Sequence, residues 1–144
     1  MATRVQIVFD RADPARLAVF WASALGYQLQ DPPEGSATWE EWLRATGVPE
    51  EDWNAASSVV DPEGRGPRLY FQRVPEGKVV KNRVHLDLNV SGSPGTPLEQ
   101  RKVRVDEEAD RLAGDGATKV RPFEQRGEYW MVMRDPEGNE FCLQ

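Results

Sequence analysis

Apolar and polar residues alternate in two short stretches of the chain, one in each half. The first, RVQIVFD at residues 4–10, places Val5, Ile7 and Phe9 on the same side of an extended backbone. The second, RVHLDLNV at residues 83–90, repeats the same order. Since successive side chains of a strand point to opposite faces, each stretch predicts a strand with one face toward a core.

The second stretch separates its residues clearly between the two faces. Val84, Leu86 and Leu88 are expected to face the core. The opposite face carries the polar residues His85, Asp87 and Asn89. His85 is the only histidine of the chain, and the alternation therefore predicts that it lies on the open face of a sheet.

Helical spacing of apolar residues follows each predicted strand. The first helix runs from Asp13, its N-cap, to Gly26, with Pro14 at the first helical position. A capping box of Thr96 and Glu99 is expected to begin the second helix. Its core-facing positions are Leu98, Val105, Ala109 and Leu112, and it is expected to end at Gly114 or Gly116.

The order of elements is the same in both halves. Each helix is followed by a short strand, with ATKV in this place in the second half, and then by a hairpin that contains Asp-Pro-Glu-Gly, at 61–64 and again at 135–138. We therefore predict an α+β fold of two tandem βαβββ modules, at about 1–74 and 82–144, within one domain over 1–144. One face of each sheet is covered by its helix, and the two open faces are expected to form a shared concave cavity.

An insertion interrupts the first module at residues 32–53. Its proline, glycine and acidic residues break the pattern, and a short helix is expected at residues 39–44. Trp39 and Trp42 share one face of this helix. They are interpreted either as a lid that stacks on a ligand or as anchors that hold the insertion on the sheet.

Composition excludes several classes of partner and site. The net charge of −6 leaves no basic surface for nucleic acid or an anionic membrane. The single cysteine, Cys142, rules out an internal disulfide and a paired-cysteine zinc site, and it is typical of a reducing compartment. No apolar run resembles a signal peptide or a membrane span, so we expect a cytoplasmic protein.

The duplicated modules carry a resemblance to a known superfamily. The segments ADPARLAVFWASALGY, VHLDLNV and RDPEGNEFCLQ resemble the vicinal oxygen chelate superfamily, which includes glyoxalase I, bleomycin-resistance proteins and extradiol dioxygenases. The chain is most similar to the small bacterial glyoxalase-like domain proteins of this superfamily. The resemblance implies paired βαβββ modules, and relatives of this kind often form homodimers.

The resemblance also implies four inherited metal-ligand positions. Metal-dependent members place one ligand near the start of the first strand and one in the last strand of each module, usually His or Glu. The matching residues here are Gln6, Tyr70, His85 and Cys142. Only His85 is of the usual type, and Cys142 replaces the usual Glu, so we expect no cofactor, with a divalent metal as the alternative.

Acid–base chemistry is the function that the open-face residues favour. His85 with Asp87 or Glu140 is expected to form the acid–base set, in which the carboxylate beside His85 serves as the general base for proton abstraction next to a carbonyl, and Tyr70 is expected to act as a proton donor. The alternative is that His85 is a half-buried strand residue bonded to a neighbour. Cys142 is interpreted as a small buried side chain, as a thiolate nucleophile paired with His85, or as a metal ligand.

Further residues are expected to bind the substrate. They share the open face of their strands or supply aromatic surface: Gln6, Arg68, Gln72, Asn89, Trp39, Trp42, Trp130 and Cys142. Asp10 and Gln144 have the same parity. The alternative for Arg68 is that it forms an ion pair with an acid at the rim.

Two hypotheses of function follow. In the first, the protein is a lyase-, isomerase- or dioxygenase-like enzyme that acts on a small polar organic molecule between the modules, without the usual His and Glu metal site. In the second, it binds an aromatic or antibiotic-like molecule without chemistry, as bleomycin-resistance proteins do. Either way the partner is a small-molecule ligand, with a homodimer permitted by the exposed strand edges.

Overall fold

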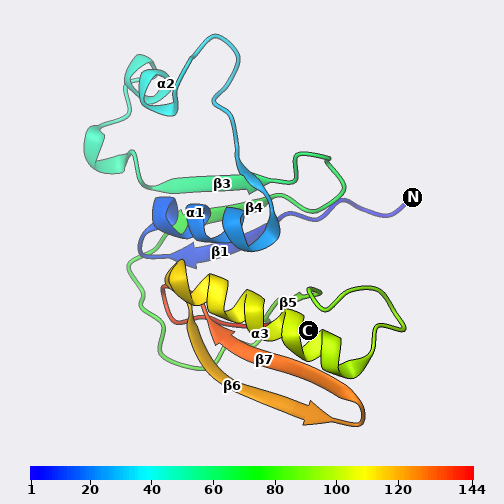
Figure 1. The fold of residues 1–144 in the computed structure, drawn as a ribbon. Coiled ribbons are helices and arrows are strands. Elements are labelled where there is room, and N and C mark those ends of the chain that lie inside the picture. The colour runs from blue at the N-terminus through cyan, green and yellow to red at the C-terminus, as the bar shows by residue number, and fades with distance from the viewer. The chain divides into compact units, whose positions relative to one another are not determined.

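A computed structural model describes residues 1–144, and its contacts divide into two compact units, Met1–Gly77 and Lys78–Gln144. The first unit has seven elements in chain order: β1 (Ile7–Arg11), α1 (Pro14–Leu25), β2 (Gln28–Leu29), α2 (Trp39–Ala45), a 3-10 helix (Glu50–Asp52), β3 (Ala56–Val60) and β4 (Leu69–Arg73). Its sheet has the strand order β1-β4-β3-β2, with β1 parallel to β4 and the other pairs antiparallel. Figure 1 shows β1, β4 and β3 side by side with α1.

The second unit repeats this topology. Its elements are β5 (Asp87–Leu88), α3 (Leu98–Gly114), β6 (Thr118–Gln125), β7 (Glu128–Arg134) and β8 (Glu140–Leu143). The strand order is β5-β8-β7-β6, and again only the first and last strands pair in parallel. The prediction of an α+β fold with two tandem βαβββ modules is confirmed. The shared cavity stays a prediction, because each pocket described below lies within one unit.

Helix α1 forms where the sequence predicted it. The Asp13 side chain accepts a hydrogen bond from the Arg16 backbone N–H at 3.2 Å, and Gly26 ends the helix in the left-handed conformation. Leu17 and Trp21 are buried against the sheet, where Trp21 stacks on Phe9 of β1. Full burial of one such side chain stabilises the fold by about 1.5–3 kcal/mol. The buried face of α1 therefore contributes much of the hydrophobic stabilisation of the first unit.

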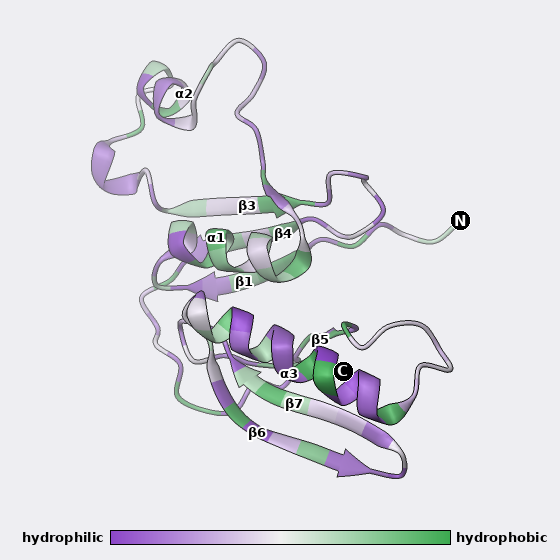
Figure 2. Cartoon of the chain, viewed as in Figure 1, coloured by the Kyte–Doolittle hydropathy of each residue, from purple (hydrophilic) through white to green (hydrophobic).

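Helix α3 confirms three of the four predicted core-facing positions, since Leu98 is only half-buried, and it does not confirm the capping box. Val105, Ala109 and Leu112 are fully buried, while polar residues fill much of the rest of the helix (Figure 2). No side chain caps its first turn, because the Thr96 hydroxyl donates to the Ser93 carbonyl at 2.8 Å instead. The capping-box prediction was therefore wrong.

The strand predicted at residues 83–90 is shorter in the structure. Pairing with β8 begins at Leu86, whose carbonyl accepts from the Cys142 N–H at 2.9 Å. Before that point the chain leaves the ladder, and the Asn82 N–H donates to the Glu140 side chain. The predicted core position of Val84 was therefore wrong, since this residue is 81% exposed, whereas Leu88 is buried.

Strand β6 is longer than the four residues expected. It extends to Gln125 and forms a hairpin with β7 through Arg126 and Gly127, both with positive φ. A register shift between Lys119 and Arg121 breaks the alternation, which hid the strand from the sequence pattern.

The insertion contains the predicted helix, α2, capped by the Thr38 side chain. The Trp39 indole N–H donates to the Gln30 carbonyl at 2.7 Å, and Trp39 packs edge-on against Trp42. The Trp53 indole N–H donates to the Val48 carbonyl at 2.9 Å. These contacts favour the anchoring interpretation of the tryptophans over a lid. None of the helices combines the length and the apolar character needed to span a bilayer.

Candidate functional site

The parallel pairing of β5 with β8 positions the polar residues of the second unit. In this register Asp87 lies opposite Cys142 and Leu88 lies opposite Leu143. Because side chains alternate along both strands, Leu88 and Leu143 enter the core while Asp87 and Cys142 share the open face. The predicted faces of this strand pair are therefore correct from Leu86 onward.

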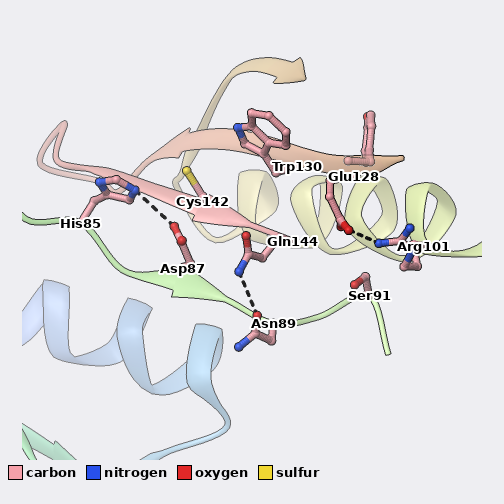
Figure 3. A pocket seen from close by; sticks show the side chains of 10 residues that line it. His85, Asp87, Asn89, Ser91, Arg101, Glu128, Trp130, Cys142 and Gln144 are labelled. Carbon is pink, nitrogen blue, oxygen red and sulfur yellow. Dashed lines mark hydrogen bonds and ion pairs between the residues drawn. The ribbon is translucent and has the colours of Figure 1, made fainter. Parts of the chain in front are cut away.

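His85 and Asp87 form the centre of this open face. The imidazole Nε2 lies 3.3 Å from Asp87 Oδ1, and the two side chains are 41% and 44% exposed (Figure 3). The Cys142 Sγ lies within 4.8 Å of the ligand atoms of both residues. The structure thus brings together a base, its carboxylate partner and a thiol, all of them reachable from solvent.

These residues line a pocket of about 550 Å³. The Gln144 side-chain amide donates to Asn89 Oδ1 at 3.1 Å along one wall, and Trp130 forms another (Figure 3). Trp130 stacks on Phe123 of the neighbouring strand, with 5.3 Å between ring centroids and an interplanar angle of 7°. The pocket therefore has hydrogen-bonding groups and one flat aromatic surface.

Sequence reasoning did not assign three pocket residues from α3 and β7. The Arg101 guanidinium lies 2.7 Å from Glu128 and donates to the Gly127 carbonyl at 2.6 Å. The Tyr129 hydroxyl donates to Asp106 at 2.6 Å, and burial together with that carboxylate raises the pKa of Tyr129 to about 12. Nothing in the residue pattern signals these contacts, because they depend on how α3 packs on the β6–β7 hairpin.

Cys142 is held as a neutral thiol. Burial, followed by the nearby Asp87 carboxylate, raises the pKa of Cys142 to about 11. At neutral pH the thiolate is therefore scarce, which argues against the interpretation of Cys142 as a ready nucleophile. The same geometry leaves the interpretation of a metal ligand open, since a cation would compete with the proton.

Glu140 is not brought to His85. Its carboxylate lies 3.2 Å from Lys78 Nζ and accepts from the Asn82 N–H at 2.9 Å, in a separate pocket. Burial favours the neutral acid, but these hydrogen bonds and the Lys78 charge lower the pKa of Glu140 below its ordinary value. Of the two partners predicted for His85, the structure places only Asp87 beside it.

The predicted residues of the first module form a different cluster. Arg68 donates to Gln6 Oε1 and to Gln30 Oε1, each at 2.6 Å, and its guanidinium lies over the Tyr70 ring at 5.1 Å. The Gln72 amide donates to Asp10 at 2.7 Å. The expected ion pair between Arg68 and a rim acid does not form, because all side-chain acceptors of Arg68 are neutral.

The inherited metal positions differ in what they offer a cation. In the first module the Gln6 oxygen already accepts from a guanidinium and Tyr70 lies beneath it, so neither residue is a free anionic ligand. In the second module His85, Asp87 and Cys142 supply one nitrogen, one oxygen and one sulfur ligand within 4.8 Å. That donor set fits a borderline-soft divalent ion such as zinc once the thiol has lost its proton.

Comparisons with known proteins agree with the two-module architecture. The family model described as "Glyoxalase-like domain" matches residues 6–144. No curated protein matches the chain. A structure of a possible glyoxalase from Bacillus cereus is similar with a TM-score of 0.61 at 17% identity, covering 100% of this chain and 99% of that one.

Two further solved structures have the same fold. A glyoxalase/bleomycin resistance protein/dioxygenase family enzyme from Burkholderia phytofirmans has a TM-score of 0.60 at 17% identity, covering 96% of this chain and 94% of that one. A mutant of the fosfomycin resistance protein FosX from Listeria monocytogenes, in complex with Mn(II) and 1S,2S-dihydroxypropylphosphonic acid, has a TM-score of 0.62 at 11% identity. In that comparison 100% of this chain and 90% of that one are covered.

Proposed function

Because this chain belongs to the glyoxalase-like domain family, we propose that its second module binds a small polar organic molecule beside His85 and moves a proton to or from it. The observation that carries the proposal is the 3.3 Å contact between His85 Nε2 and Asp87 Oδ1 in a pocket of about 550 Å³. A carboxylate that accepts from one imidazole nitrogen orients the ring and leaves the other nitrogen to act as the base.

The pocket walls support a small polar carbonyl compound as the class of substrate. Asn89, Gln144 and Ser91 offer amide and hydroxyl groups, and Trp130 offers a flat apolar surface. A small carbonyl compound with an acidic C–H fits this lining, since the amide N–H groups can stabilise the oxygen charge that develops when His85 removes the proton. Cys142 stays a neutral thiol in this scheme and lines the pocket beside Asp87.

A divalent ion on His85, Asp87 and Cys142 would supply Lewis-acid polarisation of a substrate oxygen when bound. A cation held by His85 and Asp87 would displace the hydrogen bond between them on which the acid–base role depends, so the two roles compete. Added zinc that slows the reaction would therefore favour the acid–base role, and added zinc that is required for it would favour the metal.

Solvent exchange tests the proposal whatever the final product is. A panel of small oxo acids and hydroxyketones is incubated with the protein in D2O, and loss of the C–H signal next to the carbonyl is followed by proton NMR. We expect His85→Gln to lower the exchange rate by about 100-fold or more, the usual contribution of a general base. Val84→Ala is the matched control, since Val84 is exposed and lies outside the pocket.

An exchange rate that His85→Gln leaves unchanged would contradict the proposal. Compounds that bind but never exchange would instead support the second candidate function, binding without chemistry. The observation that favours this alternative is the flat Trp130 surface stacked on Phe123. Quenching of tryptophan fluorescence that is lost in Trp130→Phe, with the ligand recovered unchanged, is the result it predicts.

A further inference from the structure

We propose that the first module carries a separate binding site for an oxyanion, built around Arg68. The ligand class is a carboxylate or a phosphate-type group of a small molecule. This site shares no residue with the His85 pocket, so it does not depend on the proposed acid–base function.

Arg68 is held in place by neutral side chains alone. Its Nε donates to Gln30 Oε1 and its Nη1 to Gln6 Oε1, both at 2.6 Å, and its Nη2 donates to Ser58 Oγ at 3.0 Å. The Tyr70 ring covers one face of the guanidinium at 5.1 Å. None of these acceptors is a carboxylate, so these contacts do not neutralise the charge of the guanidinium.

Some N–H donors of the Arg68 guanidinium have no hydrogen-bond acceptor within the protein. Arginine has five N–H donors, and the three contacts above use one each on Nε, Nη1 and Nη2. One N–H therefore remains on each of the two terminal nitrogens. Two N–H groups on adjacent terminal nitrogens are the fork that binds a carboxylate or phosphate in a bidentate manner.

The surroundings of Arg68 are positive although the protein is acidic. Arg68 and Gln6 line a pocket of about 790 Å³ together with Arg4, Arg65 and Asp61. Three arginines and one aspartate line the pocket, and Arg65 is paired with the neighbouring Glu63, so the lining together with Glu63 has a formal charge of +1 in a chain of net charge −6. Positive charge concentrated in a concave site raises the local concentration of anions.

The one acid of the pocket is already occupied. Asp61 accepts from the backbone N–H groups of Glu63, Gly66 and Arg65 at 2.8–3.0 Å, within its own turn. These hydrogen bonds hold the pKa of the Asp61 carboxyl below its ordinary value. Asp61 therefore stabilises the turn that forms the pocket wall, and the guanidinium of Arg68 remains available to an external anion.

Gln6→Glu is the most discriminating test, because it replaces the side-chain amide with a carboxylate and keeps the shape of the side chain. The new carboxylate would sit where Gln6 Oε1 now accepts from Arg68 and would neutralise the guanidinium from within the protein. Gln28→Glu is the matched control, since it adds the same charge at an exposed position of β2 without contact to Arg68.

Binding of inorganic phosphate and of acetate is measured by calorimetry at constant ionic strength. We expect both anions to bind the wild-type protein, with affinity lowered about tenfold or more in Gln6→Glu and in Arg68→Met, and unchanged in Gln28→Glu. Tighter binding of phosphate than of acetate would identify a tetrahedral oxyanion as the natural group, and the reverse order would identify a carboxylate.

Two results would overturn the site. One is the absence of phosphate and acetate binding to the wild-type protein. The other is equal binding by wild type and Gln6→Glu, which would make Arg68 only a structural clamp for Gln6, Gln30 and Ser58. Thermal unfolding of each variant checks that any loss of binding does not come from loss of the fold, and Gln6→Glu is expected to unfold no earlier than wild type.

Discussion

Strands β4 and β8, the last of their modules in chain order, occupy equivalent places in the two sheets. The side chains at their equivalent positions nevertheless differ in charge and in chemistry. Just before β4, Arg68 is a cation among neutral oxygen atoms, whereas its counterpart in β8, Glu140, is an anion paired with Lys78. Two residues further along, Tyr70 lies under the guanidinium and Cys142 lies beside Asp87.

Other equivalent positions have kept their contacts. Gln72 donates to Asp10 in the first sheet, and Gln144 donates to Asn89 in the second, at the same place in the register. The side chain of Asp61 likewise accepts backbone N–H groups within its turn. In the second Asp-Pro-Glu-Gly turn, the Asp135 side chain accepts backbone N–H groups in the same way.

In a duplicated fold, the residues at some positions can thus diverge between the two modules, whereas the residues at other positions are constrained. Core positions must be apolar and turn positions must satisfy backbone N–H groups, so both are retained in the two modules. Open-face positions carry no such constraint. We therefore interpret the first module as an anion-binding half and the second as an acid–base half of one scaffold.

The cores of the two modules should respond alike to the loss of a buried leucine, and this response is the largest we expect. Leu17→Ala in α1 and Leu112→Ala in α3 each remove a fully buried side chain and should each cost about 2–5 kcal/mol of unfolding free energy. Val19→Ala and Val103→Ala are exposed controls on the same helices, expected to change it by less than about 0.5 kcal/mol. Urea unfolding measures all four, and a Leu112→Ala cost no larger than that of Val103→Ala would show that the second core is not equivalent.

The Cys142 thiol of the second module has no counterpart in the first. We expect a more moderate effect on its reactivity than the effect of the core substitutions on stability. With its pKa raised from 9.0 to about 11, Cys142 should hold about 100-fold less thiolate near pH 8 than an ordinary cysteine. Its alkylation by iodoacetamide should rise about tenfold per pH unit up to at least pH 10. Asp87→Asn should speed the reaction because it removes a charge that raises the pKa, and Asp110→Asn is the distant control. A rate that levels off near neutral pH would contradict this description of the site.

The turn of the first module should give a smaller change, seen in the pH dependence of stability. The N–H groups of Glu63, Gly66 and Arg65 lower the pKa of Asp61, so the ionised carboxylate stabilises the folded state above the unfolded-state pKa. That stability is lost as pH falls through the lower folded-state pKa. The melting temperature between pH 6 and pH 3 should therefore fall less steeply for Asp61→Asn than for wild type, with Asp31→Asn as a control outside this turn that follows wild type.

The sequence pattern was sufficient for most of the core and for part of the candidate site, but it failed at the strand starts, where Val5 and Val84 are exposed. Alternation and helical spacing correctly placed Phe9, Val105 and Leu88, because burial of apolar side chains decides these positions. The pattern also predicted that His85 and Asp87 lie together, and their side chains are in contact although His85 precedes the paired part of the strand.

Other features depend on contacts that no local pattern encodes. Val84 is exposed because the chain joins the ladder only at Leu86, a consequence of pairing rather than of residue type. Glu140 does not contact His85, because its carboxylate forms an ion pair with Lys78 of the linker between the modules. Arg101 enters the pocket because α3 crosses the β6–β7 hairpin, which is a tertiary arrangement.

A double-mutant cycle on solvent exchange tests most directly whether His85 and Asp87 act as one unit. The exchange rate of the best compound in D2O is measured for wild type, His85→Gln, Asp87→Asn and the double variant. We predict that Asp87→Asn slows exchange about tenfold when His85 is present and has no further effect when His85 is replaced. An Asp87→Asn effect of the same size in both backgrounds would contradict the proposed pair, because Asp87 would then act without His85.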